Sequence, residues 1–280
     1  SGNGILTCLE QMEQFCRHPE HKGELTADAE KGKYAFNNIR FEEKPGGNLW
    51  IWAKPDKDIL VKNRYVVSVD IGGTTEGADW SVIRVIDRYP ILEGGVPETV
   101  ATWRGHIDQD LLAWIAVQIA EWYNHALVVV ESNSLAKEIV AAEGDHFLTV
   151  LDEIAEFYDN LYYRTSPEKI REGAPVLWGF HTNRQTKQLV IDNYKAVIRD
   201  MEYMETDARV IAELKSYQRF DDGTMGAVEG MHDDMVMSTG IGLYVSESFM
   251  SPPVLYTPQS KQQRKAKTKR KGKNITEATI

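Results

Sequence analysis

VVSVDIGGTTEGADWSVI, the stretch from Val66 to Ile83, joins two apolar runs through a turn rich in glycine and polar residues. With the preceding Tyr65, the first run reads YVVSVD, and its β-branched and aromatic residues predict a strand that ends at Asp70. An acid followed by Ile-Gly-Gly can shape the turn, help to hold the phosphates of a nucleotide, or bind a metal ion. The segments that follow favour the last of these roles.

Four further segments define the order of elements after this strand. The runs WSVIRVID and ETVATWRGHI predict two more strands, Trp80–Asp87 and Glu98–Ile107, which we expect to form a meander with the first. Residues Asp108–Ala126 repeat apolar side chains at helical spacing, with Asp108 as the expected N-cap, and lead into a continuous apolar strand, Leu127–Ser132. This order predicts an α/β fold with a mixed central β-sheet flanked by helices.

Weaker patterns divide the rest of the chain. They predict helices at 135–143, 148–158, 184–201 and 233–247, a short strand at 160–164, an irregular excursion at 166–183 and a further element at 209–220. Residues 1–63 show no strong periodicity and are expected to connect to the main domain, residues 64–250. Residues 251–280 combine prolines with a Lys/Arg run, and we expect this tail to be disordered unless it meets a polyanion.

The charge is distributed unevenly along the chain. The net charge is −10, but residues 261–280 alone carry eight Lys/Arg and one Glu, so residues 1–260 carry −17. An acidic body is not typical of a DNA-binding domain, so a nucleic acid would have to meet local basic patches, the tail or bound cations. No apolar run approaches the ~18–20 residues needed to cross a bilayer, so we expect no membrane partner.

Acidic residues fall at the ends of three predicted elements. Asp70 ends the first strand, Glu131 ends the strand after the helix, and Asp233 and Asp234 begin the last helix. If the two strands are neighbours, their carboxylates project from the same end of the sheet. Carboxylates so close repel one another, and a hard divalent cation compensates for that repulsion. The layout is that of an RNase H-like nuclease, in which two Mg²⁺ or Mn²⁺ ions activate a water and stabilise the leaving oxygen. Asp79, near Asp70, is a lesser candidate ligand.

Each acid also has an ordinary structural explanation. Asp70 can shape the turn before the glycines, and Glu131 can pair with a Lys or Arg. Asp233 or Asp234 can cap the last helix, where acids are favoured by free N–H groups and by the helix dipole. The metal-site prediction rests on all of them occurring together, in order, at element ends.

Two other functions are alternatives. DIGGTT resembles the phosphate-binding turn of sugar kinases and actin-like ATPases, but the second such turn expected in that group is missing, as is a P-loop motif. A catalytically idle RNase H-like docking module is the other alternative. Intact acids argue against it, because an idle domain has no need of carboxylates in mutual repulsion.

Four motifs in order carry a resemblance to a known family. They are VVSVDIGGTTEGADWSVIRVID, ALVVVESNSLAKE, GFHTNRQTKQLVIDNYKAVI followed by AELKSYQRF, and GMHDDMVMSTGIGLYV. Together they resemble the C-terminal nuclease domain of the large terminase subunit of tailed bacteriophages, from about Tyr65 to Val245. Other RNase H-like nucleases, such as Holliday-junction resolvases and integrases, share the acid layout but not these surrounding motifs.

This resemblance implies an endonuclease that cuts concatemeric double-stranded viral DNA during packaging, in the cytoplasm of the infected bacterium. It implies two Mg²⁺ or Mn²⁺ ions at Asp70, Glu131 and the Asp233–Asp234 pair, with His232 completing the His-Asp-Asp motif. Lys187 is a candidate contact for a DNA phosphate, or a solvated helix lysine. The implied partners are a terminase ATPase domain, which residues 1–63 would follow, the small terminase subunit and the portal.

Overall fold

The computed structural model describes residues 2–73, 79–133, 150–221 and 223–256. The strands are β1 His21–Thr26, β2 Arg40–Glu43, β3 Leu49–Ile51, β4 Val61–Lys62, β5 Tyr65–Asp70, β6 Ser81–Asp87, β7 Glu98–Gly105, β8 Leu127–Asn133, β9 Phe180–Thr182, β10 Tyr217–Arg219, β11 Met225–Ala227 and β12 Val254–Leu255. The α-helices are α1 Gly2–Glu13, α2 Gln109–Trp122, α4 Pro167–Arg171, α5 Arg184–Arg199, α6 Ala208–Ser216 and α7 Asp234–Ser248, and the 3₁₀ helices are η1 Lys33–Phe36 and η2 Tyr89–Glu93.

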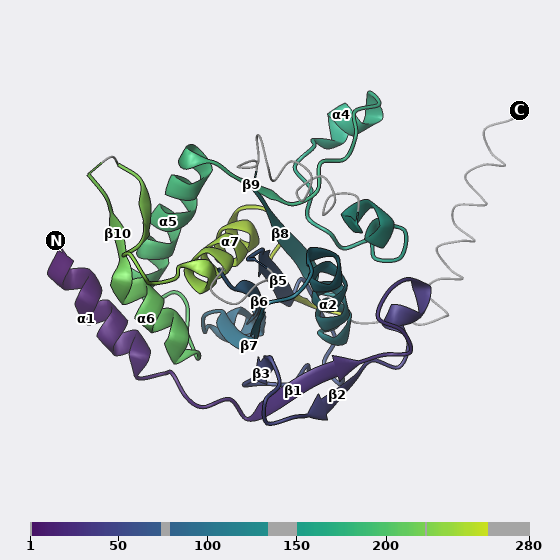
Figure 1. The fold of residues 1–280 in the computed structure, drawn as a ribbon, viewed down its shortest axis with the longest axis horizontal. Helices are drawn as coiled ribbons and strands as arrows, with labels where there is room; N and C mark the ends of the chain where they lie inside the picture. Colours follow the sequence, from purple (N-terminus) through teal and green to yellow (C-terminus); the bar gives the residue numbers. More distant parts are fainter. Residues whose placement is uncertain (1, 74–78, 134–149, 222, 257–280) are drawn as a thin grey trace, which may run out of the picture.

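A mixed, eight-stranded sheet forms the centre of the fold, in the order β2-β1-β3-β7-β6-β5-β8-β9 (Figure 1). The strands β5, β6 and β7 form the predicted antiparallel meander. After α2 the chain returns as β8, which lies parallel to β5, as the sequence predicts for neighbours whose ends carry acids. The parallel strand β9 then pairs with β8 at the sheet edge.

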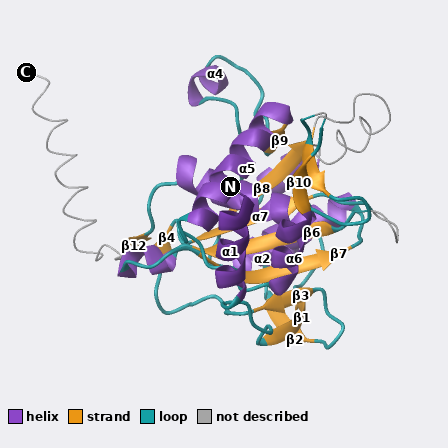
Figure 2. Cartoon of the chain, turned by 90° about the vertical axis from the view of Figure 1, so that its left-hand side faces the viewer, coloured by secondary structure: helices purple, strands orange, loops and turns teal. Residues whose placement is uncertain are grey.

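Helices cover both faces of this sheet (Figures 1 and 2). On one face α2 packs against β5 and β8, where Val67 and Val69 enter the same core as Val128 and Val130. On the other face α7 packs against β5 and β6, and α5, α6 and α1 complete that layer. Because side chains alternate along a strand, the odd-numbered valines of β5 face α2, and Ser68 and Asp70 face α7.

Two glycines let α7 lie close to its neighbours. A Cβ on Gly242 would meet Ser68 Oγ of β5 at 2.8 Å, and a Cβ on Gly240 would meet Val190 of α5 at 2.9 Å. The Ser238 hydroxyl also donates to the Ser68 carbonyl oxygen at 3.1 Å. The first residues of α7 are thereby held over the end of β5, where the acids lie.

Some segments differ from their sequence predictions. Residues 1–63 were expected to be a connection, whereas β1, β2 and β3 extend the central sheet beyond β7. Residues 160–164 make only isolated bridges, through Leu161 and Tyr163, and the strand next to β8 is β9, within the expected excursion. The helix expected at 135–143 and the tail from residue 257 lie outside the described residues. Within the described part of the chain, no helix is both long and apolar enough to cross a membrane.

Candidate metal centre

Asp70 and Glu131 form the centre of an acidic cluster. In the parallel pair β5–β8, Val69 is opposite Val130, so the next residues, Asp70 and Glu131, are neighbours on the face covered by α7. Glu131 is buried, and its carboxyl group lies next to that of Asp70. Burial and the nearby Glu131 carboxylate raise the pKa of Asp70 well above its usual range. Such a pair attracts either a proton or a cation.

Asp233 and Asp234 come from the start of α7. Asp233 occupies the N-cap position, yet its side chain caps no backbone N–H. Instead Glu213 of α6 accepts hydrogen bonds from the backbone N–H groups of Met235, at 2.9 Å, and Val236, at 3.1 Å. The capping explanation for the two aspartates therefore does not describe their side chains in this structure.

The buried side chain of Asp234 faces the loop before β6. Its Oδ2 accepts a hydrogen bond from the Trp80 backbone N–H at 2.9 Å. Burial raises the pKa of Asp234 to about 6, in spite of that hydrogen bond. The Asp234 carboxylate is thus fixed in direction by the backbone and lacks the solvation that an exposed acid has.

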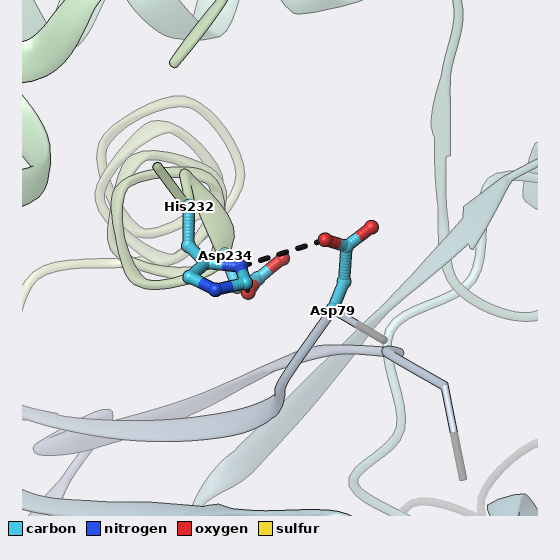
Figure 3. A group of neighbouring side chains, drawn as sticks. All are labelled: Asp79, His232 and Asp234. Atoms are coloured by element: carbon cyan, nitrogen blue, oxygen red, sulfur yellow. Dashed lines mark ion pairs between the residues drawn. The ribbon is translucent and has the colours of Figure 1, made fainter. Parts of the chain in front are cut away.

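Asp79, His232 and Asp234 form a group suited to a metal ion (Figure 3). His232 Nδ1 lies 3.5 Å from Asp79 Oδ1 and 3.7 Å from Asp234 Oδ2, and one ligand atom from each residue lies within 4.8 Å of the others. His232 Nδ1 is buried and makes no hydrogen bond to the residues that the structure describes. The residues considered auxiliary in the sequence, Asp79 and His232, are therefore joined to Asp234.

Lys187 also reaches the cluster. Its Nζ lies 3.4 Å from Asp233 Oδ2, and it lies 5.9 Å from the centre of the Tyr217 ring on β10. The side chain is 28% exposed, so it is neither a fully solvated helix lysine nor a buried structural one. The cluster thus has a partly accessible cation on the α5 side.

The four predicted acids interact electrostatically. Burial, and after it Glu131, Asp234 and Asp233, raise the pKa of the Asp70 carboxyl, whereas the group whose ligand atoms lie within 4.8 Å of one another is Asp79, His232 and Asp234. Glu213, which the sequence analysis did not single out, is the acid behind them, and burial raises its pKa to about 7. Its helical position, three residues after the buried Val210, places it on the apolar face of α6 and was the available signal.

The donor set fits a hard divalent cation. Carboxylate oxygens from Asp70, Glu131 and Asp234 are the ligands that Mg²⁺ and Mn²⁺ prefer, and the imidazole of His232 also suits transition metals. His232 Nδ1 makes no hydrogen bond among the described residues and lies beside the Asp79 and Asp234 carboxylates, so it is placed to act as a further ligand atom. The carboxylates are closer together than their charges favour, which a cation would relieve.

Comparison with known proteins gives a match in structure. No protein-family model and no curated protein matches the chain. The large terminase nuclease of thermophilic phage G20c, in a crystal structure with bound cobalt, superposes with a TM-score of 0.51 and 19% identity, over 72% of this chain and 89% of that one. Its structure with bound magnesium gives 0.51 and 16% identity, over 84% of this chain and 96% of that one. Together with the mixed, helix-flanked sheet, these matches show that the chain has the RNase H-like fold of large terminase nuclease domains.

Proposed function

We propose that this protein is a metal-dependent endonuclease that cuts concatemeric double-stranded viral DNA during genome packaging. The observation that carries the proposal is the convergence of acids at one end of the sheet: Asp70 and Glu131 are neighbours in the β5–β8 pair, and α7, which begins at the Asp233–Asp234 pair, packs against β5. The fold shared with the large terminase nuclease of phage G20c, which was crystallised with cobalt and with magnesium, supports it.

Two groups of residues would hold two divalent ions, Mg²⁺ or Mn²⁺. Asp70 and Glu131 form one group, and Asp234 with Asp79 and His232 forms the other. Bound ions supply the activation of a water and the stabilisation of the leaving oxygen in phosphodiester hydrolysis. Asp233, which lies between His232 and Asp234 in sequence, pairs with Lys187.

The remaining residues position the acids and the substrate. The Trp80 backbone N–H aims Asp234, and Glu213 fixes the start of α7 through the amides of Met235 and Val236. Lys187 is available to exchange its contact with Asp233 for a phosphate oxygen, because the pair is only half-buried. In this role the protein would work with a terminase ATPase domain, the small terminase subunit and the portal, in the cytoplasm of the infected bacterium.

The test is cleavage of supercoiled plasmid by the purified chain in Mn²⁺, in Mg²⁺ and in EDTA. We expect nicking and linearisation with a divalent ion, and the level seen in EDTA for the double variant Asp70→Asn/Glu131→Gln, which keeps the shapes of both side chains. Glu168→Gln, an exposed acid on α4, is the matched control and should cleave normally. A folded wild-type chain that cuts in neither metal would contradict the proposal. Nucleotide binding would then separate the kinase-like alternative from an idle docking module.

A further inference from the structure

A row of three side chains crosses the sheet from the acidic cluster. In the antiparallel pairs, Asp70 of β5 is opposite Val82 of β6, and Val82 is opposite Arg104 of β7. Directly opposed residues project from the same face of a sheet. At about 4.8 Å per strand, the Asp70 and Arg104 backbones are about 10 Å apart. Arg104 therefore flanks the candidate metal centre on its α6 side.

The Arg104 side chain is held by an aromatic stack. Its guanidinium carbon lies 4.5 Å from the centre of the Trp80 ring, and the other partner of Trp80 is His106, stacked at 4.0 Å with an interplanar angle of 26°. His106 Nδ1 lies 3.2 Å from the Gly73 carbonyl oxygen, which fixes the imidazole. Stacking in this way sets the plane of the guanidinium without using its N–H donors.

Those donors have no anion among the residues that the structure describes. Arg104 is half-buried and its Nε is fully covered, yet the guanidinium makes neither a hydrogen bond nor an ion pair there. Burial lowers the pKa of Arg104 and the Glu213 carboxylate acts against this, but an arginine stays charged in either case. A desolvated guanidinium without a partner is unfavourable, so this one is suited to an anionic ligand.

Among the other half-buried or buried arginines, Arg88 donates to backbone carbonyl oxygens, and three are paired with acids. Arg64 is paired with Asp87, and Arg84 with Glu205. Arg209 is the closest parallel, because it also stacks on a tryptophan, Trp50, at 3.6 Å, but it is paired with Asp207. Stacking alone thus does not leave an arginine without an anion in this protein.

We propose that Arg104 binds a backbone phosphate of the DNA next to the phosphate that is cut. The inference rests on the proposed nuclease function and adds a substrate contact to it. Trp80 links the two parts of the site, since its ring holds the Arg104 guanidinium and its backbone N–H holds Asp234 Oδ2. The planar fork of an arginine matches two phosphate oxygens, and the fixed spacing places the neighbouring linkage relative to the acids.

The first experiment is single-turnover cleavage of a defined duplex by the 280-residue chain in Mn²⁺. Single methylphosphonate linkages, which are neutral, replace each phosphate near the cut in turn. We expect one neutral linkage to slow the wild type about 10- to 100-fold, and Arg104→Gln to be slowed by a similar factor on normal DNA. When the Arg104→Gln variant cuts DNA with that one neutral linkage, the two reductions in rate should not multiply, because each change removes the same contact. Arg40→Gln, an exposed arginine on the edge strand β2, is the charge-matched control and should behave as wild type.

A second arm measures DNA binding without cleavage, by fluorescence anisotropy in the Asp70→Asn background. Adding Arg104→Gln should reduce the slope of log Kd against log salt by about 1, and Arg40→Gln should not reduce it. The Arg104 contact would be overturned if the wild type cuts DNA, the rate reductions from Arg104→Gln and from the neutral linkage multiply at every position, and the salt slope is unchanged. The nuclease proposal would then still stand. A uniform loss at every linkage together with a lower melting temperature would show a purely structural role and also overturn it. A wild type that neither cuts nor binds DNA would overturn both proposals.

Discussion

At the scale of the residue, Asp70 is held in an unfavourable environment. It lies against Glu131 and near Asp233 and Asp234, and together with burial they raise its pKa. Residues of a binding site often destabilise the folded protein when its ligand is absent. Here a bound cation would supply the positive charge that the clustered acids lack. We predict that Asp70→Asn abolishes metal-dependent cleavage but, in EDTA, raises the free energy of unfolding by about 0.5–2 kcal/mol, because the amide removes one charge and keeps the shape.

Thermal melts with and without Mn²⁺ check this prediction. The wild type should melt at a higher temperature with the ion, since a ligand that binds only the folded state stabilises it. The variant should lose most of that increase. Asp200→Asn, which removes an exposed acid paired with Arg199, serves as the control and should keep the full response to metal. An equal increase in the Asp70→Asn variant would show that the ion binds elsewhere.

The places of the acids at element ends were predictable from the sequence, and the residues packed around them were harder to find. Asp70, Glu131 and Asp234 each lie near the end of an element with a strong local pattern, so a reading along the chain finds them. Glu213 has only its place on the apolar face of α6 as a signal, and Arg104 has none. They join the site because α6 packs against α7 and because the register of β6 and β7 places Arg104 in the row of Asp70. Strand register is a property of paired strands, and a single sequence without an alignment carries little of it.

At the scale of the element, the long strands and helices were predicted from the sequence, and the short strands were missed. The strands β5, β6, β7 and β8 are long apolar runs, and α2 and α5 repeat apolar side chains at helical spacing over several turns. The helix α7 is buried on almost every side, so its length rather than its periodicity reveals it. The strand β9 has three residues, too few to show alternation. The sequence of β1, HKGELT, is largely polar, as suits a strand near the sheet edge, where exposed faces carry charges. Short or polar strands are recognised only by the strands with which they pair.

The turn between α2 and β8 provides a prediction about pH. His125 lies between two acids, with Nδ1 2.6 Å from Glu121 Oε2 and Nε2 2.6 Å from Asp159 Oδ1. The hydrogen bond to Glu121, followed by that to Asp159, raises the pKa of His125 to about 8, from an ordinary value of 6.5. A raised histidine pKa stabilises the folded state fully below pH 6.5, and the contribution is lost as the pH rises through about 8.

The measurement is the free energy of unfolding of wild type and His125→Asn between pH 6 and pH 8.5. Asparagine tolerates the left-handed backbone of this position, where φ is 61°. We expect the variant to be less stable at pH 6 by about 1 kcal/mol or less, as for other exposed ion pairs, and the difference to shrink toward pH 8.5. A difference that stays constant over this range would refute the protonated His125 pairs.

At the scale of the whole molecule, one buried arginine ties the sheet to the helices that hold the acids. Arg84 of β6 is fully buried and donates to both carboxylate oxygens of Glu205, at 2.7 and 2.6 Å, and to Asp207 at 3.3 Å. Asp207 in turn caps α6 by accepting from the Arg209 backbone N–H at 3.1 Å. Further along α6, Glu213 fixes the amides that begin α7. The contacts therefore run without a break from the centre of the sheet to Asp234.

This continuity predicts that Arg84→Met affects both stability and the site. Removing one partner of a buried ion pair leaves the Glu205 charge uncompensated, so the free energy of unfolding should fall by about 3–5 kcal/mol in urea titrations. Adding Glu205→Gln should restore part of the loss, because it removes that charge. Arg171→Met, which breaks an ion pair whose arginine is 74% exposed, is the control and should cost less than about 1 kcal/mol. Where the Arg84→Met protein is still folded, its Mn²⁺-dependent rise in melting temperature should also be smaller, since the start of α7 loses its support. A full response to metal in a destabilised but folded variant would show instead that the acids are held by β5, β8 and the α7–β5 packing alone.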